Sequence, residues 1–262
     1  MKGKKEESVN HIGILLPSNY GSFQQEFFLS VFEMQQFFYE WCIQEKRDDQ
    51  LSVLIHGGYE LSEMRNNLVE RALELGVTHL LFLDTDMSFP KQMIVTMLRD
   101  LEGNKGVEAI TGLYTRKSPP YLPHVYPKYN KRGKKFNMCG QFPMNELFKV
   151  EGAGCGCLMT KREVFERVEK PWFSFDNNDD ARVGKSKTKI PINIGEDLYF
   201  CLKAKPLILC DTRLVCKHYK MNGFDISDYI EYNGLKKVKG GFKATQKQIL
   251  QIADKYAESL KK

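Results

Sequence analysis

The sequence lacks any apolar run long enough to cross a membrane. A membrane-spanning helix needs about 20 consecutive apolar residues. The first apolar stretch, ILLP at 14–17, is also shorter than the hydrophobic region of a secretory signal. We therefore expect a cytoplasmic protein without a membrane span.

Cysteine is present but lacks the pattern of a disulfide scaffold or a zinc site. The seven cysteines are an odd number and are scattered through a chain of 262 residues, which is typical of reduced thiols in the cytosol. The CGC segment at 155–157 does not have zinc-ligand spacing, so we interpret it as small buried residues.

Acidic residues are too few to balance the basic ones, and the net charge is +6. Lysine is concentrated in three segments, 131–135, 185–189 and 236–243. A single cluster of this kind is usually a solvated loop. Three together indicate a polyanionic partner, either nucleic acid (DNA through the lysine-rich loops) or an anionic glycan.

Strand and helix patterns alternate in the first half of the chain. Short apolar runs at 11–17, 51–58, 77–84 and 107–114 predict strands, and amphipathic segments between them predict helices. This alternation favours an α/β fold with a mostly parallel sheet and helices on both faces.

The second half is less regular, and no clean linker or internal repeat divides the chain. Residues 176–195 are polar and predict a loop, and Thr160 with Glu163 and Thr245 with Gln248 match capping boxes that begin helices. The helix predicted after Thr245 is amphipathic, and its apolar face packs either on the domain itself or on a second copy of the chain in a dimer. We predict one domain over residues 1–262.

Two aspartates, Asp84 and Asp86, end the apolar run in LLFLDTDMSFP, residues 80–90. Side chains two residues apart on a strand share a face, so the carboxylates should lie close together and repel each other. Mg²⁺ or Mn²⁺ removes this penalty, because hard cations prefer carboxylate oxygens. The alternative is that the pair caps a helix that Pro90 opens.

Four further segments follow one another in a fixed order around this pair: EMRNN (63–67), GAGCG (152–156), GEDLYF (195–200) and CKHY (216–219). Together with LDTD they make the region from about residue 10 to 220 resemble GT-A-fold glycosyltransferases that use nucleotide sugars, nearest to the family-2-like enzymes of bacteriophages and bacteria. The resemblance implies a Rossmann-like GT-A sheet with a smaller acceptor-side region. It divides the domain into a nucleotide-binding half (10–114), an acceptor and catalytic half (115–220) and a basic C-terminal extension (221–262).

The resemblance implies a donor site that holds Mn²⁺ or Mg²⁺ and a nucleotide sugar, with a UDP-sugar expected. Asp86 would bind the metal directly, Asp84 would contact the ribose or the metal through water, and His218 would complete the coordination. The alternative for His218 is a surface histidine beside Lys217. Pro17 and Ser18 fall where the family seats the nucleoside base.

Arg65 and Asn66 open a predicted helix, where a cationic side chain suits a nucleotide or phosphate. The alternative is a surface ion pair between Arg65 and a glutamate at 63 or 70. In place of the family's acidic residue after the second strand the sequence reads HGGYE (56–60), which leaves recognition of the base open.

Glu196 and Asp197 are the predicted catalytic pair, and the resemblance makes Asp197 the base that deprotonates the acceptor hydroxyl if the enzyme inverts. The alternative is that both acids complement a helix dipole. Gly154, in GAGCG, would let the backbone approach donor sugar or acceptor closely.

The sequence therefore predicts a metal-dependent glycosyltransferase whose acceptor hydroxyl belongs to a glycan or to a modified base in phage DNA; host cytoplasm would then be its location. Two alternatives stay open. One is a phosphatase of the haloacid dehalogenase type, which also places an Asp-x-Asp motif at a strand end. The other is a basic nucleic-acid-binding module without enzymatic activity.

Overall fold

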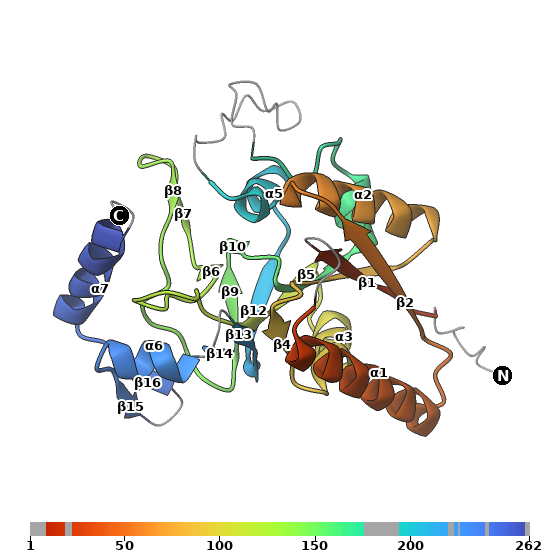
Figure 1. Cartoon of the computed structure of the whole chain (residues 1–262), viewed down its shortest axis with the longest axis horizontal. Coiled ribbons are helices and arrows are strands. Elements are labelled where there is room, and N and C mark those ends of the chain that lie inside the picture. Colours follow the sequence, from red (N-terminus) through yellow and green to blue (C-terminus); the bar gives the residue numbers. More distant parts are fainter. Residues whose placement is uncertain are drawn as a thin grey trace.

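A computed structural model describes residues 9–18, 23–175, 194–219, 223–224, 226–238 and 241–259 (Figure 1). The lysine cluster at 185–189 and nearly all of the polar loop predicted at 176–195 lie outside these ranges. None of the described helices is both long and apolar enough to cross a membrane.

The centre of the fold is a seven-stranded sheet with the order β2-β1-β3-β11-β5-β12-β9. Strands β2, β1, β3, β5 and β12 run in one direction, and β11 and β9 run against them. The bounds are β1 His11–Ser18, β2 Gln50–Gly57, β3 His79–Leu83, β5 Ala109–Leu113, β9 Leu147–Val150, β11 Cys157–Lys161 and β12 Ile208–Val215. The predicted mostly parallel α/β sheet is confirmed, with one addition: antiparallel β11 separates β3 from β5.

Helices cover both faces of this sheet, as the sequence predicts (Figure 1). On one face α1 and α3 bury apolar residues against alternate positions of β1 and β3, and on the other face α2, α4 and α5 do the same. The bounds are α1 Gln25–Glu45, α2 Leu61–Glu74, α3 Met93–Gly103, α4 Arg162–Glu166 and α5 Glu196–Ala204. Strand β3 is buried at every position because it contributes to both cores.

Smaller elements form a further region beyond the central sheet. They are β4 Met87–Ser88, β13 Lys217–Tyr219 and β14 Gly223–Phe224 in one small sheet, β6 Val125–Tyr126 paired with β10 Gly152–Ala153, and the hairpin of β7 Tyr129–Asn130 and β8 Lys135–Phe136. The 131–135 lysine cluster forms the tip of that hairpin and is exposed.

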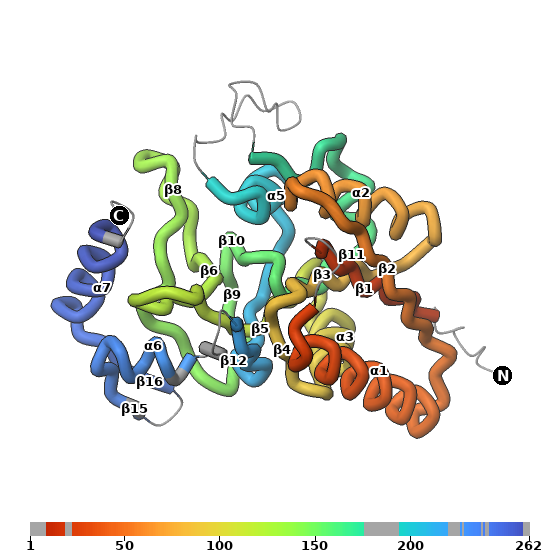
Figure 2. Tube along the Cα trace, viewed as in Figure 1, coloured from red at the N-terminus to blue at the C-terminus, as the bar shows by residue number. Residues whose placement is uncertain are grey.

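The C-terminal extension continues this region away from β2. It consists of α6 Ile226–Tyr232, β15 Lys236–Val238, β16 Gly241–Lys243 and α7 Gln246–Ser259. Helix α7 lies at the opposite end of the molecule from β2, next to the β7–β8 hairpin (Figure 2). Within the 236–243 lysine cluster, Lys236, Lys237 and Lys243 lie on the paired strands β15 and β16, and residues 239–240 lie outside the described ranges.

Candidate functional site

Asp84 and Asp86 occupy the turn between β3 and β4, at the carboxyl edge of the parallel strands. The Asp84 backbone N–H donates to the carbonyl oxygen of Gly156 at 3.1 Å, and the Asp86 carbonyl accepts from the Tyr219 N–H at 2.8 Å. The turn is therefore held from both sides, by the segment before β11 and by β13. Ligands in open α/β sheets bind at this edge.

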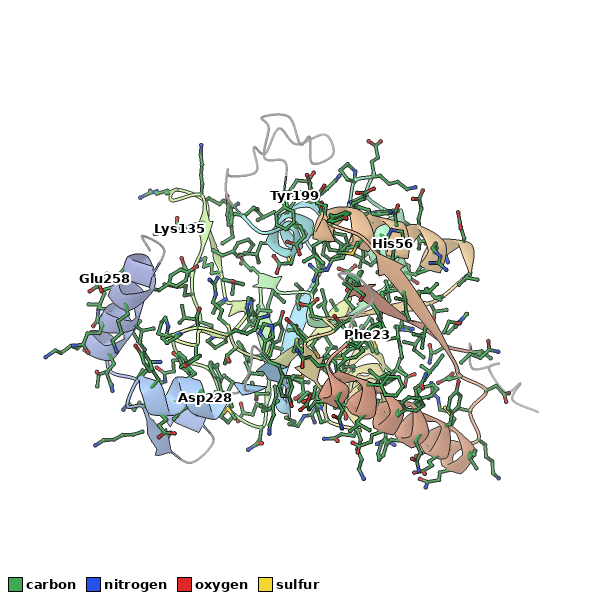
Figure 3. The ribbon with its side chains drawn as sticks, in the orientation of Figure 1. Phe23, His56, Lys135, Tyr199, Asp228 and Glu258 are labelled. Atoms are coloured by element: carbon green, nitrogen blue, oxygen red, sulfur yellow. The ribbon has the colours of Figure 1, made fainter. Side chains whose placement is uncertain are left out.

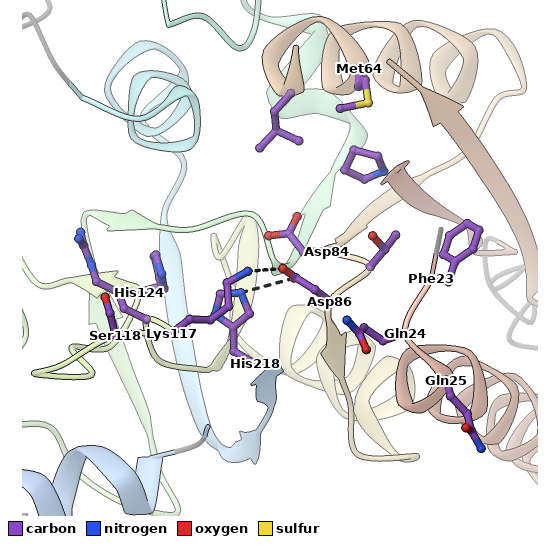
Figure 4. Close-up of a pocket in the computed structure, with 14 residues that line it drawn as sticks. Phe23, Gln24, Gln25, Met64, Asp84, Asp86, Lys117, Ser118, His124 and His218 are labelled. Carbon is purple, nitrogen blue, oxygen red and sulfur yellow. Dashed lines mark hydrogen bonds and ion pairs between the residues drawn. The ribbon is translucent and has the colours of Figure 1, made fainter. Parts of the chain in front are cut away.

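Both carboxylates line a cavity of about 790 Å³ (Figure 4). One wall carries Pro17, Phe23 and Met64, and the opposite wall carries Lys117, His124 and His218. The cavity thus has an apolar end and a charged end, with the two aspartates between them. This size and composition suit a small-molecule ligand with polar and apolar parts.

The Asp86 carboxylate is bracketed by two cationic or polar side chains. Lys117 makes an ion pair with Oδ2, and His218 Nε2 lies 3.4 Å from Oδ1 (Figure 4). Burial alone would raise the pKa of Asp86, but the hydrogen bonds from His218 and Lys117 lower that pKa to about 2. Asp86 is therefore a carboxylate over the physiological pH range.

The His218 ring is oriented by a backbone group. Its Nδ1 lies 2.8 Å from the carbonyl oxygen of Thr115, and a carbonyl oxygen only accepts, so Nδ1 carries the proton. With Nδ1 protonated, Nε2 donates to Asp86 only when the ring carries a second proton, and in the neutral ring Nε2 presents a lone pair that a cation can take. A histidine whose far nitrogen donates to a carbonyl while its near nitrogen faces a carboxylate has the outer-shell arrangement of a metal ligand.

The residues present fit a divalent cation that takes part of its coordination from a ligand. Within the described ranges, no group of three or more His, Cys, Asp or Glu side chains stands close enough to hold a metal ion alone. Mg²⁺-type sites for nucleotides commonly use one or two carboxylates, with substrate oxygens and water as the other ligands. Asp86, His218 and the nearby Asp84 satisfy that smaller requirement.

Arg65 links Asp84 to the predicted catalytic pair. Its guanidinium, 2% exposed, donates to Asp84 Oδ1 at 2.8 Å and forms a buried ion pair with Glu196. Arg65 thus orients Asp84, whose second oxygen is left for other contacts. Glu196 is a structural partner of Arg65 in this arrangement, and the predicted alternatives of an ion pair at position 63 or 70 are wrong.

Asp197 lies beside the glycine-rich segment and the hydroxyl of Tyr114. A Cβ on Gly154 would collide with that hydroxyl and reach within 3.3 Å of Asp197 Oδ2. The hydroxyl accepts from the Gly156 N–H at 3.0 Å, and a Cβ on Gly156 would lie 3.0 Å from Asp84 Oδ2. Both glycines are therefore needed for the close approach of Asp84, Tyr114 and Asp197.

Burial raises the pKa of Asp197, and the nearby charge of Arg65 opposes the rise. A carboxylate with a raised pKa in a partly desolvated setting has the properties of a general base. Burial also raises the pKa of Tyr114 well above its ordinary value, so the tyrosine stays a neutral hydroxyl.

Of the predicted site residues, Pro17, Asp84, Asp86 and His218 line the cavity; six do not, namely Ser18, Arg65, Asn66, Gly154, Glu196 and Asp197. Asn66 accepts hydrogen bonds from the backbone N–H groups of Trp172 and Phe173 and donates to the Phe173 carbonyl, which gives it a structural role. Ser18 is fully buried at the end of β1, next to Pro17, which does line the cavity.

Sequence reasoning missed Phe23, Lys117 and His124 as cavity residues. Lys117 and His124 follow β5 at the same carboxyl edge as Asp84, so their position after a predicted strand was an available signal. Phe23 stacks on Phe27 with ring centroids 5.6 Å apart, and nothing in its sequence context marks it as part of a site.

No family model matches this sequence, and no curated protein matches it. Among solved structures, the crystal structure of A197 from STIV has a similar fold: the TM-score is 0.53 at 20% identity, over 81% of this chain and 86% of the other. This likeness concerns the fold alone, which is a Rossmann-like α/β fold with a mostly parallel central sheet, as in the GT-A arrangement.

Proposed function

We propose that this protein is a metal-dependent glycosyltransferase that transfers a sugar from a nucleotide sugar, a UDP-sugar being the expected donor, to an acceptor hydroxyl. The observation that carries the proposal is the pair of Asp86 and His218, with His218 Nε2 3.4 Å from the carboxylate and Nδ1 held by a backbone carbonyl. Two such groups facing each other favour a cation between them.

The two ends of the cavity suit the two ends of such a donor. Pro17, Phe23 and Met64 offer apolar and aromatic surface for a nucleoside, and Lys117 offers an ammonium group for a diphosphate. Asp86 and His218 would hold Mn²⁺ or Mg²⁺, with Asp84 beside them. When bound, that ion would offset negative charge on the leaving diphosphate.

The remaining groups have separate tasks. Asp197 would accept the proton of the acceptor hydroxyl, since its pKa is raised and its Oδ2 adjoins the glycine-rich segment. Arg65 would keep Asp84 in place through the bond at 2.8 Å, and Tyr114 would exclude water between Asp84 and Asp197. Glu196 would hold Arg65 in place through their buried ion pair.

Thermal unfolding with a panel of nucleoside diphosphates, each with and without Mn²⁺, tests this function. A ligand that binds the folded state alone stabilises it by ~2.7 kcal/mol at a hundredfold excess over Kd. We expect one nucleoside diphosphate to raise the Tm in the presence of Mn²⁺. The absence of any shift would favour the phosphatase or the nucleic-acid-binding module instead.

A further inference from the structure

A second cavity, of about 740 Å³, lies on the acceptor side between the β7–β8 hairpin, the start of α5, and α7. Its wall is largely apolar and aromatic, with Phe136, Tyr126 and Tyr256 as the rings. Its cationic lining groups are Lys135, at the base of the basic hairpin tip, and Arg116. Figure 3 shows Lys135 at the same end of the molecule as Glu258 of α7.

Arg116 borders both cavities, and its charge is not neutralised within the described part of the chain. Its guanidinium donates to the hydroxyls of Tyr256 at 2.6 Å and Tyr126 at 3.1 Å, and it stacks 4.6 Å over the Tyr256 ring. Neither hydroxyl carries a negative charge. Among the described arginines, an Asp or Glu pairs with Arg47, Arg65, Arg99, Arg162, Arg167 and Arg213. Arg71 and Arg132 have no such pair but are exposed, whereas Arg116 is half-buried.

A half-buried cation with neutral partners only is a site for an anion, because desolvating a charge without a counter-charge is costly. Burial raises the pKa of Asp197 and the charge of Arg116 opposes that rise, although the two described side chains do not form an ion pair. An anion on Arg116 would therefore place its attached group beside the proposed base. The flanking rings suit a flat aromatic group, and the basic hairpin suits further phosphates.

We infer that this second cavity binds the acceptor as one nucleotide unit of a nucleic acid, with the base among Tyr126, Phe136 and Tyr256 and its phosphate on Arg116. This inference rests on the proposed glycosyltransferase function and names its acceptor class. Lys131, Arg132 and Lys134, exposed at the hairpin tip, would contact neighbouring phosphates. Binding would then weaken steeply with salt.

Fluorescence anisotropy with a labelled single-stranded oligodeoxynucleotide tests the site. Ala253 lines the second cavity but not the first, so Ala253→Trp fills the former alone. We expect this variant to weaken binding about tenfold or more, the order of one lost base stack. Gln251→Trp, on the exposed side of the same helix, is the matched control and should bind as the wild type does.

Two further variants extend the test. Arg116→Gln should also weaken binding, and Lys134→Gln should lower the slope of log affinity against log salt by about one. Oligonucleotide binding that is absent, or equally strong in Ala253→Trp, would overturn the inference, as would tighter binding of an acidic oligosaccharide at the same cavity. Nucleoside diphosphate and Mn²⁺ shifts measured on Ala253→Trp report on the donor site separately, so failure of the acceptor assignment is distinguishable from failure of the proposed function.

Discussion

His218 directs Nε2 at Asp86, 3.4 Å from Oδ1, while its Nδ1 proton is held by the Thr115 carbonyl oxygen 2.8 Å away. Because the ring is fixed by a backbone group on another segment, it keeps this orientation without a ligand. The ammonium of Lys117 contacts the other oxygen of the same carboxylate. Asp86 is therefore shared between a cationic side chain of the protein and the position proposed for a metal ion.

Lys117→Met should increase the affinity for Mn²⁺ in the absence of nucleotide. The ammonium competes with the ion for the carboxylate, and a partly exposed ion pair of this kind contributes about 0.2–1 kcal/mol, or about 1.4- to fivefold in affinity. Isothermal titration with Mn²⁺ measures the change. Lys91→Met is the control, because Lys91 does not line the cavity and its ammonium lies over the Phe37 ring. Equal or weaker binding in Lys117→Met would contradict competition.

Arg65→Met should destabilise the protein by about 3–5 kcal/mol, because it leaves the buried Glu196 carboxylate and Asp84 without a counter-charge. Urea unfolding followed by circular dichroism gives the free energy of unfolding. Arg132→Gln, at the exposed hairpin tip, should change it by less than about 0.5 kcal/mol. If Arg65→Met lowers the free energy of unfolding no more than this control does, the two ion pairs of Arg65 contribute nothing to stability.

Much of the fold follows from local pattern in the sequence. Periodicity located the strands now seen as β1, β2, β3 and β5 to within a few residues. The antiparallel insertion of β11 was not predicted, because it depends on pairing with two strands that are distant in sequence. Pairing between segments that are distant in sequence cannot be predicted from the residues of one short segment.

The two capping boxes show the same limit. At α7 the prediction is confirmed: Gln248 N–H donates to Thr245 Oγ1 at 3.2 Å, and Thr245 N–H donates to Gln248 Oε1 at 2.9 Å. At α4 it is wrong, because Thr160 lies inside β11, fully buried, and the helix begins at Arg162. Tertiary pairing overrides the local signal there.

The candidate site was predictable where a residue follows a strand, and less so elsewhere. Asp84, Asp86 and His218 meet in one cavity because their strands end at one edge of the sheet. The buried ion pair of Arg65 and Glu196 joins residues 131 positions apart in the sequence, so no local pattern predicts it. Their functional roles stay predictions.

Asp197→Asn and Glu196→Gln should separate catalysis from structure. Loss of a general base lowers kcat by about 10²–10⁴-fold, so Asp197→Asn should nearly abolish release of nucleoside diphosphate from the donor sugar while keeping nucleotide affinity. Glu196→Gln should chiefly lower the free energy of unfolding, since it weakens the pair with Arg65. Turnover and urea unfolding of both variants check this. A kcat of Asp197→Asn equal to that of the wild type would show that Asp197 is not the general base.

His79 should make stability fall as the pH is lowered from about 6.5 to about 4. Burial lowers the pKa of the folded-state imidazole from 6.5 to about 4, so between these values the unfolded state binds the extra proton. The shift corresponds to about 3 kcal/mol, fully lost near pH 4. Urea unfolding across this range should show a shallower loss in His79→Gln than in the wild type; parallel curves would contradict the buried neutral histidine.

Calorimetric titration of nucleoside diphosphate, with and without Mn²⁺, into the wild type and Asp86→Asn tests whether Asp86 helps to hold the metal ion and the donor. The side-chain amide keeps the size of Asp86 but removes its negative charge and its ion pair with Lys117, so a Tm within a few degrees of the wild type without ligand shows that the variant is folded. We expect Mn²⁺-dependent binding of one nucleoside diphosphate to the wild type and at least a tenfold loss of affinity in Asp86→Asn. Equal Mn²⁺-dependent affinity in the two proteins would contradict the assignment of Asp86 and His218 as the metal and donor site.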